Sequence, residues 1–298
     1  MSTRMFAMCV SLMGLMAGPT LASSMWWQPY TTDANTLGLW HFDDVTGSTG
    51  SFADSSGNGN NGTLNANAGG NAGLTLTVPA VSGAGVGLFG TALDYDETKD
   101  PLPGNPTDTP FAWGSVPNGG GQLNYGNAVT LEAWIKPTAG DLAPSPSKRE
   151  AYIAGSTIGA AGFNFGIYQG ELFVDTRDTS SVYRYAQQSG VTLVADTWAH
   201  VAAVLSNDGT NSTATVYVNG SSVATSSWAD TALGPASSIL NIGANGTSAQ
   251  YVMLRSQLDE VRLSNVAREF GPAPEVPEPA SLPLLALGGL MAMGRRRA

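Results

Sequence analysis

The most informative pattern of apolar and polar positions lies between residues 197 and 220. Residues 198–205 read Trp-Ala-His-Val-Ala-Ala-Val-Leu, so both faces of an extended strand would carry mostly apolar side chains. Residues 213–219 alternate polar with apolar, which is typical of a strand with one face toward solvent. Asn207-Asp208-Gly209 between them tolerates positive φ. The stretch therefore predicts a β-hairpin whose first strand is buried on both faces.

Short apolar runs bounded by Gly, Asn and Asp predict further strands along the chain. They cover residues 37–42, 75–78, 91–95, 129–136, 152–158, 163–169, 171–177, 181–187, 239–243 and 257–263. Residues 43–84, apart from the run at 75–78, have the composition of loops and turns. Residues 101–121 are rich in Pro and Gly, and we expect them to lie outside the sheets, as an ordered functional loop or a disordered one. This spacing favours an antiparallel sandwich.

Composition limits the class of protein. A chain of 298 residues with 42% hydrophobic residues is long enough for one large β-sandwich with a single core. The formal charge of −10 would repel nucleic acid and anionic lipid, so neither is expected to bind the folded domain. Cys9 is the only cysteine and falls in the apolar N-terminal run, so no disulfide is expected in the mature protein.

The N-terminus has the pattern of a secretory signal peptide. Arg4 is followed by an apolar run over residues 5–21 and by small residues at 22–24. Residues 1–24 are therefore predicted to be a signal peptide, cleaved after Ala22 or Ser24, and residues 25–35 a linker. The alternative is an N-terminal membrane anchor.

The C-terminus carries a second pattern that is typical of a sorting signal. After a linker at residues 271–275, residues 276–298 combine Val-Pro-Glu-Pro-Ala, an apolar stretch at 282–293 and three arginines. This order resembles the PEP-CTERM sorting signal of Gram-negative bacteria. The apolar stretch would reach about 18 Å as a helix, short of the roughly 30 Å of a bilayer core, which favours a transient inner-membrane anchor.

The PEP-CTERM resemblance implies processing and a location. An exosortase-type membrane enzyme would cleave near Pro277, Glu278 and Pro279. The protein would then reach the cell surface or extracellular matrix, often alongside exopolysaccharide. Membrane contact is expected only through the tail before processing.

Several short motifs follow one another in the body of the chain. They are Leu39-Trp40-His41-Phe42-Asp43, the Asn/Gly-rich loop at 54–62, Val129 to Pro137, Trp198-Ala199-His200-Val201 with Val216 to Gly220, and Leu258 to Ser264. Their order across residues 36–270 resembles the LamG-like domains of the concanavalin A-like lectin/glucanase group. The resemblance implies an all-β fold, a concanavalin A-like antiparallel β-sandwich or jelly roll. One such fold hosts many functions.

The same resemblance implies a structural calcium ion. The loop at 54–62 offers the Asp54 carboxylate, amide and hydroxyl oxygens, and glycines that turn carbonyls toward a cation. In LamG-like domains this loop meets the end of the Leu-Asp-Glu-Val-Arg strand near calcium, so the implied ligands are Asp54, Asn60 and Asp259. The alternative is an Asn/Gly turn held by Asx hydrogen bonds, with Asp259 paired to an arginine.

Catalysis is not expected. Asp94 with Asp96, and Glu171 with Asp175, have spacings that would place two carboxylates on one face of a strand, as a glycosidase requires. The Glu-x-Asp-x-Glu run of the related glucanases is absent from the chain, so we expect no catalytic residues. His41 and His200 alternate with apolar residues and are expected to be hydrogen-bonded core histidines.

Sugar binding would need exposed aromatic rings near polar side chains. Trp113, Tyr125, Trp228 and Tyr251 lie beside predicted loops and are the candidate ligand-binding residues, although each is also suited to packing at the rim. We expect an exported, surface-sorted, non-enzymatic protein that binds extracellular polysaccharide or a surface glycan. The alternatives are a structural or adhesive envelope protein acting through protein contacts, and a divergent glycoside hydrolase.

Overall fold

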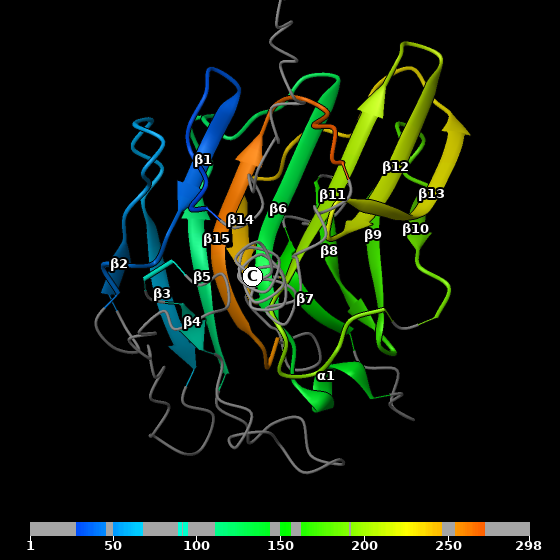
Figure 1. Ribbon diagram of the computed structural model, residues 1–298. Coiled ribbons are helices and arrows are strands. Elements are labelled where there is room, and N and C mark those ends of the chain that lie inside the picture. The colour runs from blue at the N-terminus through cyan, green and yellow to red at the C-terminus, as the bar shows by residue number, and fades with distance from the viewer. Residues whose placement is uncertain are drawn as a thin grey trace, which may run out of the picture. The chain divides into compact units, whose positions relative to one another are not determined.

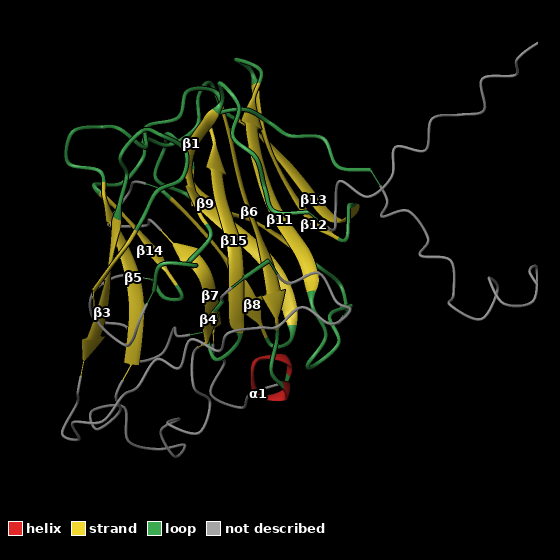
Figure 2. Ribbon diagram, turned by 60° about the vertical axis from the view of Figure 1, so that its left-hand side comes forward, coloured by secondary structure: helices red, strands yellow, loops and turns green. Residues whose placement is uncertain are grey.

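The structure is a computed structural model, and it is described for residues 28–45, 50–67, 89–90, 92–94, 111–143, 150–155, 162–190, 192–245 and 254–271. Residues 26–273 form one compact unit. Within the described residues nearly all regular structure is strand, with a single helical turn, α1 (Ala139–Leu142) (Figure 2). No helix in this part of the chain is long and apolar enough to span a membrane. The predicted signal peptide, the predicted sorting tail and the predicted strand at 75–78 lie outside the described residues.

The strands form two antiparallel sheets. Sheet A has the order β1-β15-β6-β11-β12-β13, with β4 beside β15. Its members are β1 (Thr36–Trp40), β15 (Gln257–Ser264), β6 (Ala128–Lys136), β11 (Ala199–Asn207), β12 (Asn211–Val218), β13 (Ser221–Ala229) and β4 (Leu93–Asp94). Its strands lie side by side in Figure 1. Consecutive neighbours such as β11-β12-β13 are hairpins, whereas β1 and β15 join the two ends of the domain.

Sheet B has the order β10-β9-β8-β7-β14-β5-β3-β2. Its members are β10 (Tyr183–Gln187), β9 (Glu171–Arg177), β8 (Phe163–Tyr168), β7 (Glu150–Gly155), β14 (Ile239–Ile242), β5 (Phe111–Pro117), β3 (Gly62–Asn67) and β2 (Gly50–Phe52). The two sheets enclose one large apolar core. The predicted antiparallel β-sandwich is confirmed.

The hairpin predicted at 197–220 lies inside sheet A. β11 pairs with β6 on one side and with β12 on the other. Val201, Ala203 and Leu205 enter the core between the sheets. Ala202 and Val204 point to the outer face and are also buried. The prediction of a strand buried on both faces is confirmed.

Two flanking segments cover the outer face of sheet A. In the segment before β1, Tyr30 lies under the Arg262 guanidinium, 4.6 Å from ring centroid to charge centre. In the segment after β15, the Phe270 ring packs 5.2 Å from His200 and 5.0 Å from Tyr217. A bidentate ion pair between Arg268 and Asp33 joins the two segments. Because these two segments cover the outer face of sheet A, the outward side chains of β11 are apolar as well.

The prediction that residues 101–121 stay outside the sheets is wrong, because β5 lies between β14 and β3. The inward position Gly114 has no side chain, and an added Cβ there would lie 3.1 Å from the Phe52 ring and 3.3 Å from the Cβ of Ile242. Neighbouring strands thus fill the space that β5 leaves empty. β2 and β3 likewise fall within residues 43–84, which were predicted to be loops.

Candidate functional site

The outward face of sheet B carries polar and aromatic side chains. In β8, Phe163, Phe165 and Ile167 belong to the core, so Asn164 and Tyr168 point to the opposite face. The same alternation in the paired strands defines a continuous outward face. This face is the candidate site.

Strand pairing aligns one residue from each of seven strands into a row across this face. Each neighbour is a register partner of the next, from β10 to β3, and the row consists of Tyr185, Asp175, Asn164, Gly155, Asn241, Ser115 and Thr63. We call these residues the polar row. Apart from Gly155, every member carries a hydroxyl, amide or carboxyl group. Tyr185 and Thr63 are exposed and Ser115 is half-buried, so the two ends of the row can exchange hydrogen bonds with a ligand.

The centre of the polar row is buried and incompletely paired. The Asn164 Nδ2 donates to Asp175 Oδ1 at 2.8 Å. The Oδ1 atoms of Asn164 and Asn241 are buried without a hydrogen-bond partner, in residues that are 0% and 1% exposed. Burial raises the pKa of Asp175 to about 7 despite the hydrogen bond from Asn164, and the nearby Glu150 charge adds to the rise.

Aromatic rings surround this polar centre. Tyr183 and Tyr185 on β10, the edge strand, are 49% and 62% exposed. The Arg177 guanidinium lies 4.3 Å from the centroid of the Tyr183 ring. The Phe173 ring packs edge-on against Tyr152 at 5.6 Å, centroid to centroid. Exposed rings beside hydrogen-bonding groups are the usual composition of a sugar-binding surface.

Of the predicted ligand-binding residues, Trp113 belongs to this face. It is half-buried on β5, where it pairs with Asn65 two positions from Ser115. Trp228 is 8% exposed and belongs to the core, because Ala224 and Trp228 face inward on β13. The expectation that Trp228 stacks on a sugar is therefore wrong. Tyr251 lies outside the described residues.

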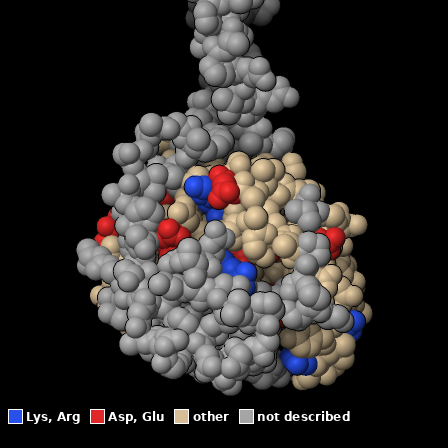
Figure 3. Space-filling model, turned by 90° about the horizontal axis from the view of Figure 1, so that it is seen from below, with Lys and Arg blue, Asp and Glu red and all other residues tan. Residues whose placement is uncertain are grey.

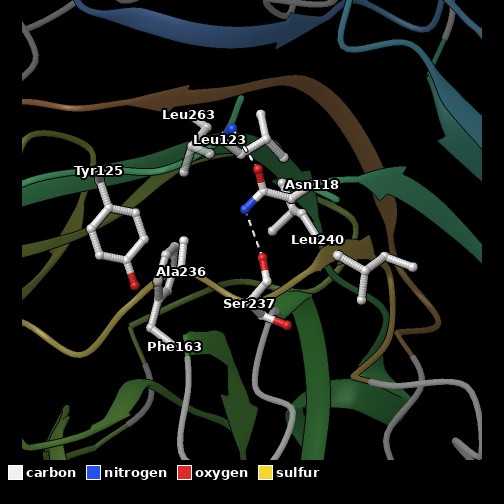
Figure 4. A pocket seen from close by; sticks show the side chains of 9 residues that line it. Asn118, Leu123, Tyr125, Phe163, Ala236, Ser237, Leu240 and Leu263 are labelled. Atoms are coloured by element: carbon white, nitrogen blue, oxygen red, sulfur yellow. Dashed lines mark hydrogen bonds between the residues drawn. The ribbon is translucent and has the colours of Figure 1, made fainter. Parts of the chain in front are cut away.

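Tyr125 lines a crevice at a different place. Its ring packs 5.9 Å from that of Phe163, beside Asn118, which donates to the Ser237 carbonyl at 2.7 Å (Figure 4). Burial raises the Tyr125 pKa well above its usual value. The crevice has room for about 10 Å³, roughly one water molecule, so it does not admit a sugar ring.

The loop at 54–62 does not fit the calcium site that the resemblance implies. The Asp54 carboxylate accepts from the backbone N–H of Leu39 at 3.0 Å, of Ser56 at 2.8 Å and of Asn60 at 2.9 Å. It also accepts from the Ser56 hydroxyl at 2.7 Å. The Asp54 oxygens that a cation would need as ligands thus already accept hydrogen bonds from these donors. The geometry is that of the alternative, a turn held by Asx hydrogen bonds.

Asp259 shares no hydrogen bond with this loop. It accepts from its neighbour's N–H, that of Glu260, at 2.8 Å and from the Phe89 N–H at 3.4 Å, rather than from an arginine. Burial raises the Asp259 pKa to about 8, and the Glu260 charge adds to this. Within the described residues, no group of three or more His, Cys, Asp or Glu side chains is placed to hold a metal. The calcium ion stays a prediction without support from this geometry.

The two histidines belong to the outer face of sheet A. His200 is fully buried, and its Nε2 lies 3.2 Å from Glu132 Oε2. His41 is partly exposed, with its Nδ1 2.5 Å from Glu260 Oε1. The hydrogen bond that the His41 ring donates to Glu260 raises the His41 pKa. Both histidines therefore contact a buried carboxylate.

The predicted carboxylate pairs are held in structural contacts. Asp94 accepts from the Gln257 side chain at 3.1 Å, and Asp96 lies outside the described residues. Glu171 shares a face of β9 with Asp175, but it accepts from Gln187 Nε2 at 2.9 Å and from the Gly190 N–H at 2.7 Å.

Seen from below, charged side chains of the described surface are scattered (Figure 3).

A family comparison agrees with this architecture. The sequence model of the concanavalin A-like lectin/glucanases superfamily matches residues 108–269, more than half of the chain. The chain belongs to this superfamily. The concanavalin A-like lectin/glucanases fold is thus shown by sequence as well as by the two sheets. None of the curated proteins compared with the chain matches it significantly.

Solved structures share the fold at low identity. The receptor binding domain of botulinum neurotoxin mosaic serotype C/D is 12% identical with a TM-score of 0.53, over 79% of this chain and 48% of that chain. The binding domain of Paraclostridial Mosquitocidal Protein 1 is 15% identical with a TM-score of 0.53, over 79% and 50%. The chain spans about half the length of these structures. At such identity the likeness concerns the fold alone.

The exposed tyrosines were missed by the sequence analysis. The run Tyr183-Arg184-Tyr185 alternates rings with a charged residue, which indicates that both rings share one face. Which face looks outward depends on the pairing of β10 with β9, and this pairing joins Tyr185 to Asp175.

Proposed function

We propose that this protein is a non-enzymatic binding protein that recognises extracellular polysaccharide or a surface glycan through the outward face of sheet B. The observation that carries the proposal is the polar row, with the exposed Tyr183 and Tyr185 at its β10 end and Trp113 near its β5 end. Pyranose rings stack on aromatic faces while their hydroxyls bond to carboxyl and amide groups.

The length of the polar row favours a polymer over a single sugar. Neighbouring strands lie about 4.8 Å apart, so the five intervals from β10 to β5 span roughly 24 Å. A chain of several sugar rings could contact both exposed ends of the row, whereas a monosaccharide would reach only one of them.

Export and surface sorting complete the proposal. The signal peptide at 1–24 and the PEP-CTERM-like tail at 276–298 would deliver the domain to the cell surface or extracellular matrix of a Gram-negative bacterium. Processing near Pro277, Glu278 and Pro279 by an exosortase-type enzyme is part of the same proposal. Both similar structures are binding domains, which is a precedent for a binding role on this fold.

The test is retention of the full chain on a panel of immobilised polysaccharides, with a Tyr183→Ala/Tyr185→Ala double variant. We expect retention on one polymer class and at least a tenfold loss of affinity in the double variant, because two exposed rings are removed. Val194→Ala is the matched control, since Val194 is 63% exposed but lies outside the polar row. Retention that is equal in both variants would contradict the proposal.

A specific observation favours a second candidate, adhesion through protein contacts. β10 is an edge strand, and Val182 before it is exposed together with Tyr183 and Tyr185. Capture of an envelope protein that competing sugars do not displace, and that the tyrosine double variant loses, would support this second function. Release of reducing sugar from any retained polymer would instead indicate a glycoside hydrolase.

A further inference from the structure

Strand β10 is an open edge of sheet B that carries exposed apolar side chains. Among the described residues it pairs with β9 alone, so the backbone N–H and C=O groups on its other side have no strand partner there. Of the four large hydrophobic residues that are exposed in this part of the chain, three lie on β10 or directly before it, namely Val182, Tyr183 and Tyr185. An open backbone edge beside such a cluster is typical of a strand that pairs with another chain.

The side of the sandwich around this edge carries almost no charge. β13, the edge strand of sheet A, lies beside β10 on this side (Figure 1). Arg184 is the only charged residue in the two strands, and its Nε donates to Asp178 Oδ2 at 2.8 Å. The chain as a whole has a formal charge of −10, so two copies repel each other in general, and these two strands add little to that repulsion.

The sequence of β10 suits antiparallel pairing with a second copy of itself. A two-fold axis at Tyr185, the middle of its five residues, would pair Tyr185 with its own copy and Tyr183 with Gln187. Arg184 would then oppose Ala186, so no like charges meet. A register centred on Arg184 would place two arginines opposite each other, and one centred on Ala186 would pair only residues 185–187. The register centred on Tyr185 therefore pairs the whole strand without repulsion.

We propose that the protein forms a two-fold symmetric dimer in which β10 of one copy pairs antiparallel with β10 of the other. The two copies of sheet B then form one continuous sheet. The axis is perpendicular to this sheet, so the outward faces of both copies lie on the same side. Side chains stand perpendicular to a sheet, and the two Tyr185 rings thus meet across the axis on the outward face.

The dimer joins two polar rows end to end. Tyr185 is the last residue of the row in one copy, so the row of the second copy continues from the Tyr185 beside it. A polymer that binds one copy would then meet the second row at a high effective concentration. Pairing of the β10 strands needs no ligand, so the inference goes beyond the proposed function and does not depend on it.

The test measures self-association of the full chain by sedimentation velocity, without polysaccharide, over a series of protein concentrations at pH 7. We expect the wild type to dimerise. Tyr185→Lys places two positive charges opposite each other at the axis and should weaken the dimer at least tenfold, whereas Tyr185→Phe keeps the ring and should dimerise like wild type. Val194→Lys is the matched control, since it adds the same charge at a residue that is 63% exposed and lies outside β10 and β13.

A charge-swap experiment tests the register. Tyr185→Glu should also weaken the dimer at least tenfold, because it places two carboxylates opposite each other. A mixture of the Tyr185→Lys and Tyr185→Glu chains brings opposite charges together at the axis and should restore a dimer that neither variant forms alone. Hydrogen exchange gives a second reading. The amides of β10 should exchange more slowly in the dimer, while those of β2, at the other end of sheet B, should not change.

A wild type that stays monomeric at every concentration would overturn the inference. A dimer that Tyr185→Lys leaves unchanged would also overturn it, because the contact would then lie elsewhere on the chain. Both results are independent of the polysaccharide test. Retention of a monomeric wild type on a polymer would overturn the dimer and leave the proposed function intact, whereas a β10-paired dimer that binds no polymer would do the reverse.

Discussion

The buried Glu132 on the outer face of sheet A gives a quantitative prediction. Its side chain is almost fully buried and accepts from the guanidinium of Arg262 at 2.7 and 2.8 Å. The Nε atoms of Arg268 and His200 lie at 3.5 Å and 3.2 Å from its oxygens. Glu132→Gln keeps the shape of this side chain but removes the charge that these groups surround.

Removal of one partner from a buried ion pair costs about 3–5 kcal/mol, because the remaining charge stays desolvated. Arg262 and Arg268 are each partly exposed, with side chains at 13% and 17%, so they can reach water and the lower end applies. We therefore expect Glu132→Gln to lower the free energy of unfolding by about 3 kcal/mol. In a domain of this size the loss corresponds to roughly 6–12 °C in melting temperature.

The sign of the pH dependence follows from the Glu132 pKa. Burial raises this pKa, but the hydrogen bond from His200 and the charge of Arg262 outweigh burial, and the net pKa is lowered. A lowered carboxyl pKa stabilises the fold above the unfolded value near 4.5, and this contribution is lost as the pH falls through the folded pKa. The difference between wild type and Glu132→Gln should therefore shrink below about pH 4.

Urea unfolding followed by tryptophan fluorescence measures both effects. Asp33→Asn is the matched control, because Asp33 pairs with Arg268 at an exposed position and should cost less than about 1 kcal/mol. A Glu132→Gln variant as stable as Asp33→Asn at pH 7 would refute the reasoning. So would a difference that does not change between pH 7 and pH 3.

Three further predictions concern other parts of the domain. The Asp175 pKa is raised to about 7, so ionisation of Asp175 opposes folding as the pH rises from 4. Relative to wild type, Asp175→Asn should therefore raise the free energy of unfolding by up to roughly 4 kcal/mol at pH 8 and leave it unchanged at pH 4. Urea unfolding measures the difference. Gly62→Ala would push a Cβ into the Phe52 ring and should lower stability by about 1–3 kcal/mol in the same assay. Asp54→Ala should destabilise the domain by at least 2 kcal/mol with or without calcium, because four donors lose their acceptor. A calcium-dependent rise in the wild-type melting temperature, absent in Asp54→Ala, would contradict the last prediction.

The sequence predicted the strands whose side chains themselves form a clear pattern. The run 198–205 is apolar on both faces, and the structure buries both faces of β11. β5 was missed because its inward position Gly114 has no side chain, and the residues that complete the core there come from β2 and β14. The residue pattern of a single stretch does not reveal core side chains that come from other strands.

The candidate site was less accessible to sequence analysis. Trp113 was identified as an aromatic residue, but the polar row that it flanks depends on the pairing of seven strands far apart in the chain. Asn164 and Asn241 are separated by more than seventy positions, and only the pairing of β8 and β14 with β7 places them in one row. Trp228 was placed wrongly because β13 extends to Ala229 and turns this ring inward.

Polysaccharide retention of the full chain, with and without the Tyr183→Ala/Tyr185→Ala change, tests the central claim most directly. We expect retention on one polymer class, at least a tenfold loss in the tyrosine variant and no loss in Val194→Ala. Absence of retention on every polymer by a folded, β-rich chain would contradict a polysaccharide-binding role for the outward face of sheet B.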